Sequence, residues 1–203
     1  MKKEIIFATH NDHKVKELKS IIKDTCENCS IEVLTLKDIQ FDVKIPETKN
    51  TLEGNAIQKA RFIKNHTGYD CFADDTGLEI EALNGEPGVY SARYAGEQAS
   101  FEDNVRKVLK KLNGAKNRNA RFRTVIAHSV ESKDYLFEGE IEGVILETPR
   151  GDGGFGYDPI FRPKKHRKSF AEMPDKQKNK ISHRYHATKQ FALWLNEQAE
   201  KSK

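Results

Sequence analysis

Two adjacent aspartates, Asp74 and Asp75, are the residues whose types and spacing most directly indicate chemistry. They close a short apolar run and precede Thr76-Gly77, so a buried strand is expected to end at the pair and enter a turn. Two ionised carboxylates side by side repel each other unless a divalent cation or a shared proton compensates them. The pair therefore indicates a metal or acid–base site, and a turn acid with an acidic neighbour fits the same residues equally well.

A second candidate is the polar segment 9–14, which joins an apolar run to the first helical pattern. Such a turn places backbone N–H groups at the positive end of a helix, so it predicts an anion site with Lys14 as a cation. The structural alternative is that Asn11 caps the helix and Lys14 is solvated. The segment lacks G-x-G-x-x-G and G-x-x-x-x-G-K-[ST], so neither a Rossmann dinucleotide site nor a P-loop is supported.

A glycine-rich loop at residues 149–159 holds Phe155 and Tyr157 among its glycines. Glycine lets a backbone approach a ligand closely, and an aromatic ring in such a loop can stack on a planar base. Further along, cationic side chains crowd the start of the last helical pattern, where Arg184 suits recognition of an oxyanion or a carbonyl edge. Without a catalytic Ser or Cys arrangement, these clusters indicate metal-assisted chemistry on an aromatic polyanion such as a nucleoside triphosphate.

Composition narrows the class of protein. The chain has 203 residues with 35 Lys and Arg against 31 Asp and Glu, and its net charge of +4 is weaker than that of duplex-binding modules. No apolar run approaches the roughly 20 residues of a membrane span and no signal peptide is recognised, so we expect a cytoplasmic protein. Three cysteines argue against a disulfide framework, and Cys26-x-x-Cys29 lacks a second ligand pair for zinc.

The elements that must position these residues mix the periods of strands and helices. Strands are predicted at residues 3–8, 31–35 and 69–75, a helix at 12–23, an Asn50–Glu53 capping box before a helix that Gly68 ends, and a Ser100 cap on a further helix. Residues 120–130 and 135–146 alternate as in an antiparallel hairpin, and Ser182 is expected to cap a last helix. The mixture predicts one α/β domain over residues 1–203 with a mixed sheet.

The chain resembles the inosine triphosphate pyrophosphatase family, the dITP/XTP pyrophosphatases that clear non-standard purine nucleotides. Short motifs carry the resemblance in the same order along the chain, and together they are far more specific than any one of them. They are Ala8-Thr9-His10-Asn11-Asp12-His13-Lys14, Asn55-Ala56 with Lys59-Ala60, Ala73-Asp74-Asp75-Thr76-Gly77-Leu78, Pro87-Gly88-Val89-Tyr90-Ser91-Ala92-Arg93-Tyr94, Gly153-Gly154-Phe155-Gly156-Tyr157-Asp158-Pro159-Ile160-Phe161 and Ser182-His183-Arg184.

The resemblance implies an elongated, two-lobed α/β domain whose mixed sheet is flanked by helices and which has a central nucleotide-binding cleft. It also implies a homodimer that uses Mg²⁺ to convert ITP, dITP or XTP and water into the monophosphate and pyrophosphate. By motif position Asp75 is the proton acceptor and a magnesium ligand, and Glu47 is a second acid associated with the metal.

The resemblance further divides the substrate contacts between two ends of the nucleotide. The phosphate and sugar side is assigned to Thr9, His10, Asn11, Asp12, His13, Lys14 and Thr76, with Lys59 and Arg93 as further phosphate contacts. The base side is assigned to Phe155, Gly156, Tyr157, Asp158, Lys178, His183 and Arg184. Phe155 is expected to stack on the base and Arg184 to reach its 6-keto oxygen, which adenine lacks.

The acidic motif Asp74-Asp75-Thr76-Gly77 is also compared with the motifs of other protein classes. Asp75-Thr76-Gly77 is also the aspartic-protease triplet, but that mechanism needs two triplets in an almost all-β fold, and this chain has one triplet among predicted helices. A D-x-D-x-T phosphatase fails on spacing because the two acids are adjacent. A pyrophosphatase of pyrimidine or modified nucleotides and a non-catalytic nucleotide-binding regulator are the closer alternatives, and the regulator does not need the acidic pair.

Overall fold

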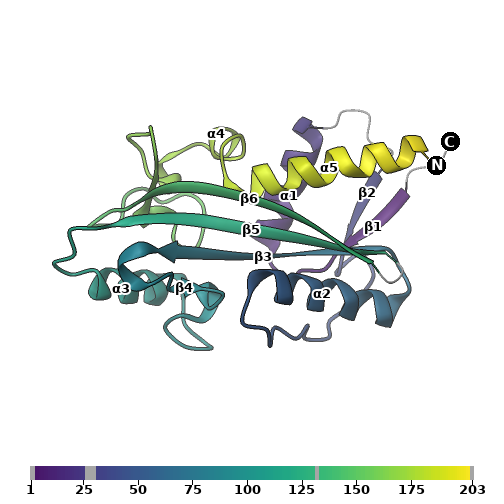
Figure 1. Cartoon of the computed structure of the whole chain (residues 1–203), viewed down its shortest axis with the longest axis horizontal. Coiled ribbons are helices and arrows are strands. Elements are labelled where there is room, and N and C mark those ends of the chain that lie inside the picture. The colour runs from purple at the N-terminus through teal and green to yellow at the C-terminus, as the bar shows by residue number, and fades with distance from the viewer. Residues whose placement is uncertain (1–2, 26–30, 131–132, 202–203) are drawn as a thin grey trace. The chain divides into compact units, whose positions relative to one another are not determined.

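The computed structural model describes residues 3–25, 31–130 and 133–201, so the Cys26-x-x-Cys29 pair lies outside the described residues (Figure 1). The chain forms two compact units that alternate along the sequence. Unit 1 contains Met1–Asp75, Thr124–Gly139 and Arg184–Lys203, and unit 2 contains Thr76–Arg123 and Glu140–His183. The boundary after Asp75 therefore falls inside the acidic motif.

The described residues form one mixed seven-stranded sheet with the order β2-β1-β3-β5-β6-β7 and β4 paired to β3. The β1 strand runs parallel to β2 and β3, while β4 is antiparallel to β3 and β7 is antiparallel to β6. This confirms the predicted α/β fold with a mixed sheet. The strands are β1 (Lys3–Phe7), β2 (Ile31–Thr35), β3 (Cys71–Ile80), β4 (Pro87–Gly88), β5 (Asn119–Val130), β6 (Lys133–Ile145) and β7 (Phe161–Pro163).

Side chains that alternate along β1 and β3 give unit 1 two different buried faces. Phe7 and Phe72 stack with ring centroids 4.8 Å apart, on the face covered by α1 (Asp12–Thr25) and α5 (His183–Lys201). The intervening residues, which include Ile6 and Ala73, pack with α2 (Leu52–Thr67). Figure 1 shows α1 and α5 on one side of these strands and α2 on the other.

The α2 helix begins one residue later than the predicted capping box requires. Thr51 is the N-cap, and its hydroxyl oxygen accepts a hydrogen bond from the Gly54 N–H at 3.0 Å. Glu53 consequently occupies the second helical position, whereas a capping box needs the acid at the third. The prediction of Asn50 as the cap was wrong, but the predicted stop at Gly68 is confirmed by its left-handed φ of 74°.

The β3 strand does not end at the aspartates. It continues to Ile80, so the predicted turn at Asp75-Thr76-Gly77 was wrong. The cause is close pairing with β4, because a Cβ atom at Gly77 would lie 2.6 Å from the Gly88 carbonyl oxygen. Glycine here marks the approach of another strand rather than a turn.

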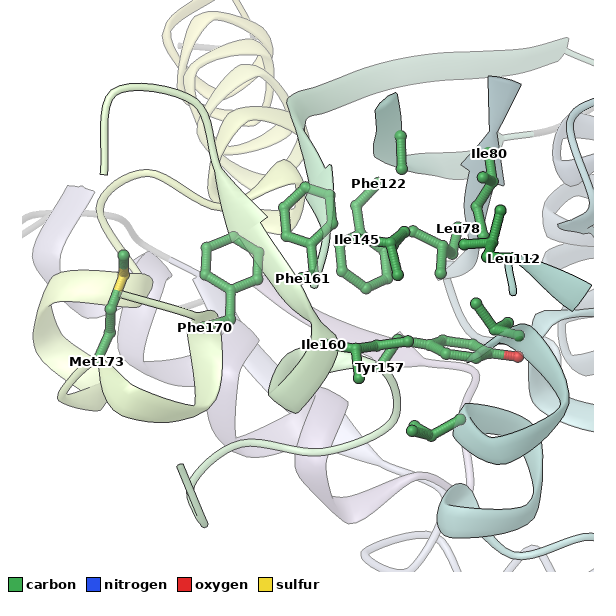
Figure 2. Packing of buried hydrophobic residues seen from close by; sticks show 13 residues of the cluster. Leu78, Ile80, Leu112, Phe122, Ile145, Tyr157, Ile160, Phe161, Phe170 and Met173 are labelled. Carbon is green, nitrogen blue, oxygen red and sulfur yellow. The ribbon is translucent and has the colours of Figure 1, made fainter. Parts of the chain in front are cut away.

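Unit 2 is built around an aromatic core. Figure 2 shows Phe122, Phe161 and Phe170 beside Tyr157, whose hydroxyl donates a hydrogen bond to the Ser91 carbonyl at 2.8 Å. The predicted cap at Ser100 is confirmed, since it forms a capping box with Asp103. The remaining helical segments of this unit are α3 (Phe101–Lys111), α4 (Asp175–Lys178) and the 3₁₀ turns Glu81–Leu83, Ser91–Arg93, Asp158–Ile160 and Phe170–Glu172.

Two further predictions concern the last helix and the pair of alternating segments. The α5 helix begins at His183, directly after Ser182, and the alternating segments are the neighbouring strands β5 and β6. Among the described residues, no helix combines the length and apolarity that crossing a bilayer would require.

The assignment of the α2 cap predicts a difference between two neighbouring substitutions. Thr51→Ala removes the side-chain acceptor for Gly54 N–H and should lower the free energy of unfolding by about 1 kcal/mol. Asn50→Ala, one residue earlier and exposed, should change it by only a few tenths of a kcal/mol. Urea unfolding of both variants measures the difference, and a larger loss for Asn50→Ala would contradict the assignment.

Candidate active site

The two adjacent aspartates lie on opposite faces of β3. Successive side chains of a strand point to opposite sides, so Asp74 shares the face of Phe72 and Asp75 shares the face of Ala73. Asp74 accordingly meets residues of α1 and α5, whereas Asp75 meets residues of α2. The hydrogen bonds and ion pairs of the two carboxylates accordingly involve different residues.

Asp74 is held between two cations. Its side chain is 1% exposed, and the Lys14 ammonium lies 3.0 and 2.9 Å from its two carboxylate oxygens. The Arg184 Nε lies 3.7 Å from the second oxygen, and Arg184 also donates a hydrogen bond to Glu17. Arg184, assigned by the resemblance to the base, thus has two carboxylate partners within unit 1.

Asp75 has a different set of neighbours, all presented around the first turns of α2. The Asn55 side-chain amide donates a hydrogen bond to its Oδ2 at 3.1 Å. The Lys59 ammonium lies 3.4 Å from its Oδ1 and 2.5 Å from Glu47 Oε1, so one lysine bridges the two acids predicted to be associated with metal. Asp75 is 7% exposed, which is more than Asp74.

These surroundings shift the pKa values of the two aspartates in opposite directions. Burial opposes ionisation of Asp74, but Lys14 and Arg184 outweigh it and hold the pKa of this carboxyl below the ordinary value of 3.8. Burial raises the pKa of Asp75 above 3.8, and the opposing charge of Lys59 does not cancel that effect. The two adjacent acids therefore differ in how readily each one ionises.

The pKa values of the two lysines beside the aspartates are also shifted in opposite directions. Burial lowers the pKa of Lys14 despite the attraction of Asp74. Burial also disfavours charge on Lys59, but Asp75 and Glu47 overcome it and raise its pKa above 10.5. Lys59, a secondary candidate in the sequence, is therefore a protonated cation between two carboxylates.

Several side chains of the predicted phosphate turn, residues 9–14, already have hydrogen-bond or ion-pair partners within the protein. Asn11 Oδ1 accepts hydrogen bonds from the backbone N–H groups of His13 and Lys14 at 3.0 and 3.2 Å, so the side chain of Asn11 caps α1. The Asp12 carboxylate pairs with Lys37 at 2.7 Å, and His10 Nε2 lies 3.2 Å from the Val43 carbonyl oxygen. Of the six residues of this turn, Lys14 is the one whose side chain contacts the acidic motif.

In unit 2 the base-side residues gather around a buried ion pair. The Lys178 ammonium donates to Asp158 Oδ2 at 2.5 Å, and the same oxygen accepts the backbone N–H of Phe155 at 2.8 Å. Lys178 also lies 5.0 Å from the centroid of the Phe155 ring. The Lys178–Asp158 pair thus fixes the backbone of Phe155. The half-buried ring of Phe155 is a suitable platform for stacking on a base.

Other base-side residues take structural places. Tyr157 is packed in the core of unit 2, so its side chain has little surface for a ligand. His183 stacks on Phe122 at 4.6 Å between centroids and is also buried. Gly154 has a φ of 70°, and a Cβ there would lie 2.1 Å from Asp158 Oδ2, so this glycine serves the fold of the loop rather than a ligand.

The remaining candidates lie outside these clusters. Gly156 is half-buried with a φ of 62°, and Thr76 is the half-buried first residue of unit 2 on β3. Arg93 pairs with Glu97 at 3.5 Å and lies over the Tyr90 ring at 5.5 Å from its centroid. His128 is buried with its Nδ1 2.9 Å from the Cys71 carbonyl oxygen.

The acidic cluster consists of Asp74, Asp75 and their partners Lys14, Glu17, Glu47, Asn55, Lys59 and Arg184. For two of these residues, Glu17 and Asn55, the sequence predicted no role. Glu17 follows Lys14 by three positions, so helical spacing places both on one side of α1, but nothing in the sequence links it to Arg184. Asn55 belongs to a motif of the resemblance without an assigned role. Its position four residues before Lys59 on α2 is the signal that could have placed it near the lysine.

The donor set near Asp75 fits Mg²⁺ shared with a substrate. Asp75 and Glu47 offer hard carboxylate oxygens on either side of one cation, which shows that a positive charge is accommodated between them. Among the described residues, no group of three or more His, Cys, Asp or Glu side chains could cage a metal. Mg²⁺ commonly uses one or two carboxylates together with water and substrate phosphates, so this set fits that mode.

The fold and the acidic cluster define a mixed α/β protein with a buried carboxylate flanked by lysines, as phosphate chemistry requires. The model of the Ham1 family matches residues 5–194, and the chain belongs to this family.

Individual relatives agree over nearly full length. The chain is 52% identical to the dITP/XTP pyrophosphatase of Flavobacterium johnsoniae, covering 93% of this chain and 95% of that protein, and 47% identical to that of Bacillus subtilis, covering 95% and 97%. Its fold is similar to the Ham1 protein of Staphylococcus aureus, with a TM-score of 0.85 and 39% identity over 97% of this chain and 100% of that one.

The different electrostatics of the aspartates predict unequal effects on stability. At pH 7 the Asp74 charge stabilises the fold because its pKa is lowered, so Asp74→Asn should reduce the free energy of unfolding by about 3 kcal/mol and leave buried cations undercompensated. Asp75→Asn should reduce it by less, because burial disfavours ionisation of Asp75 and so offsets part of the lost attraction to Lys59. Chemical unfolding of both metal-free variants is the measurement, and equal losses would contradict the assignment.

Proposed function

We propose that this protein hydrolyses the non-standard purine nucleotides dITP, XTP and ITP to their monophosphates and pyrophosphate. The observation that carries the proposal is the environment of Asp75, a buried carboxylate of raised pKa held by Asn55 and Lys59 beside Glu47. Relatives 47 to 52% identical to this chain are dITP/XTP pyrophosphatases, which supports the same activity here. The reaction removes such nucleotides from the pool of polymerase substrates.

Each residue of the acidic cluster has a defined task in this reaction. Asp75 accepts the proton of the attacking water, because its raised pKa makes it a stronger base than an ordinary aspartate. Lys59 and Lys14 offer positive charge to phosphate oxygens, and Asp74 holds Lys14 in position. Asp75 and Glu47 would hold Mg²⁺, which when bound supplies Lewis-acid neutralisation of the triphosphate charge.

Recognition of the base is assigned to the segment that carries Phe155. Phe155 offers a ring whose backbone is fixed by Asp158, and Lys178 lies over that ring. Selectivity for a 6-keto purine requires donors that adenine would leave unpaired. The family resemblance of the surrounding motifs supports this assignment, and it also supports a homodimeric state.

A substrate panel tests the proposal. With Mg²⁺ present, the protein should release pyrophosphate from dITP, XTP and ITP and should turn over ATP and GTP more slowly. For ATP we expect a difference of at least about tenfold, because its 6-amino group leaves donors for a 6-keto oxygen unpaired. Guanine keeps the 6-keto oxygen and differs from hypoxanthine at its 2-amino group, so slower turnover of GTP requires rejection of that group. Adding a chelator should abolish the release. Separate colorimetric measurements of pyrophosphate and orthophosphate identify the product.

Asp75→Asn is the matched control for this panel, because it removes the proton acceptor with almost no change in shape. It should reduce turnover of dITP by at least about a thousandfold while the protein stays folded. Release of orthophosphate by the wild type, or equal turnover of ATP and dITP, would overturn the proposed function. Activity retained by Asp75→Asn would show that another group accepts the proton.

A further inference from the structure

We propose that Asn55 is a positioning residue that fixes the orientation of the Asp75 carboxylate. The inference deepens the proposed function and rests on it. Asn55 is 1% exposed and lies on α2, and its side chain connects Asp75 with the segment that carries Glu47.

The orientation of the Asn55 amide follows from its other partner. Asn55 Oδ1 accepts the backbone N–H of Lys49 at 2.9 Å. Because that N–H can only donate, the amide oxygen must face Lys49 and the amide NH₂ must face Asp75. The hydrogen bond to Asp75 Oδ2 therefore has a fixed direction, in which the carboxylate accepts.

This direction makes the two oxygens of Asp75 unequal. Oδ2 receives the Asn55 amide at 3.1 Å, whereas Oδ1 has a longer contact of 3.4 Å with Lys59, which lies closer to Glu47. Each oxygen therefore accepts from a different donor, and the Asn55 amide, whose direction is fixed, sets the orientation of the carboxylate, while both oxygens keep further lone pairs for other partners. Asn55 thus acts on Asp75 by orienting it.

Helical spacing extends the same arrangement to Glu47. Asn55, Gln58 and Lys59 stand at positions i, i+3 and i+4 of α2 and share one side of the helix. Gln58 forms two hydrogen bonds of 2.9 Å with Thr48, one to its backbone N–H and one to its hydroxyl. With the Asn55–Lys49 bond, this helix side fixes the backbone directly after Glu47 while Asn55 fixes Asp75.

Asn104 provides a matched control for the test. It is 2% exposed on α3, its Oδ1 accepts the Ala95 N–H at 2.7 Å, and its amide donates to the Ala92 carbonyl at 3.2 Å. Asn55→Ala and Asn104→Ala therefore remove the same group and similar bonds from equally buried helix positions. They differ in the group that receives the amide hydrogen bond, a carboxylate in one case and a backbone carbonyl in the other.

The kinetic test compares dITP hydrolysis by these two variants. Asn55→Ala should lower kcat by about tenfold to a hundredfold with KM changed by less than about threefold, because substrate binding survives while the Asp75 carboxylate loses its orientation. Asn104→Ala should lower thermal stability and leave kcat unchanged. Equal kcat values for Asn55→Ala and the wild type would overturn the proposal.

A second measurement does not depend on activity or on the Asn55 variant folding. In metal-free protein, the Asn55 side-chain amide resonances in a ¹H–¹⁵N NMR spectrum should shift on Asp75→Ala, and those of Asn104 should not.

The two measurements separate the possible failures. If the wild type hydrolyses no nucleoside triphosphate but the Asn55 resonances shift, the proposed function fails and the Asn55–Asp75 contact stands. If dITP is hydrolysed but the Asn55 resonances are unmoved by Asp75→Ala, the positioning proposal fails alone.

Discussion

The alternation of side chains along β3 is the constraint on which the acidic cluster depends. Because β3 continues through the motif, adjacent aspartates are sent to opposite faces of the strand, where they meet different helices. Two carboxylates that would repel each other on one face are thus separated without a shared proton. A turn at this place would have removed the distinction.

The separation gives each carboxylate the surroundings that its task needs. Asp74 meets Lys14 and Arg184 and remains ionised, which stabilises the fold and keeps Lys14 in place. Asp75 is buried with less compensation and becomes the more basic of the two. Two neighbouring residues of the same type therefore differ, since ionisation of Asp74 stabilises the fold whereas burial disfavours the charge of Asp75.

The sequence predicted those parts of the fold that local patterns determine. The β2 strand, the stop at Gly68 and the Ser100 cap follow from short-range periodicity and capping chemistry. The sequence did not predict that β3 continues beyond Asp75. Gly77 is typical of a turn, and its role in pairing becomes clear only when its partner Gly88 is known. The predicted cap at Asn50 was wrong by one residue, because Thr51 is the residue whose side chain caps the helix. Differences of one or two residues are usual at helix ends.

The same limit applies to the acidic cluster. Motifs identified Asp75, Glu47 and Lys14, but the Lys14–Asp74 contact joins positions sixty residues apart and follows only from the packing of α1 against the sheet. The role of Asn55 depends on a backbone N–H of Lys49, which no side-chain pattern encodes. Conversely, several glycines of the 149–159 loop are required by the loop itself, as Gly154 is by Asp158.

The central claim is that strand alternation gives two adjacent aspartates opposite protonation behaviour. Carboxyl ¹³C NMR titration of the metal-free protein, assigned with Asp74→Asn and Asp75→Asn, tests it most directly. Asp74 should titrate below 3.8 and Asp75 above it. Titration of both on the same side of 3.8, or a biphasic curve for each that indicates a shared proton, would contradict it.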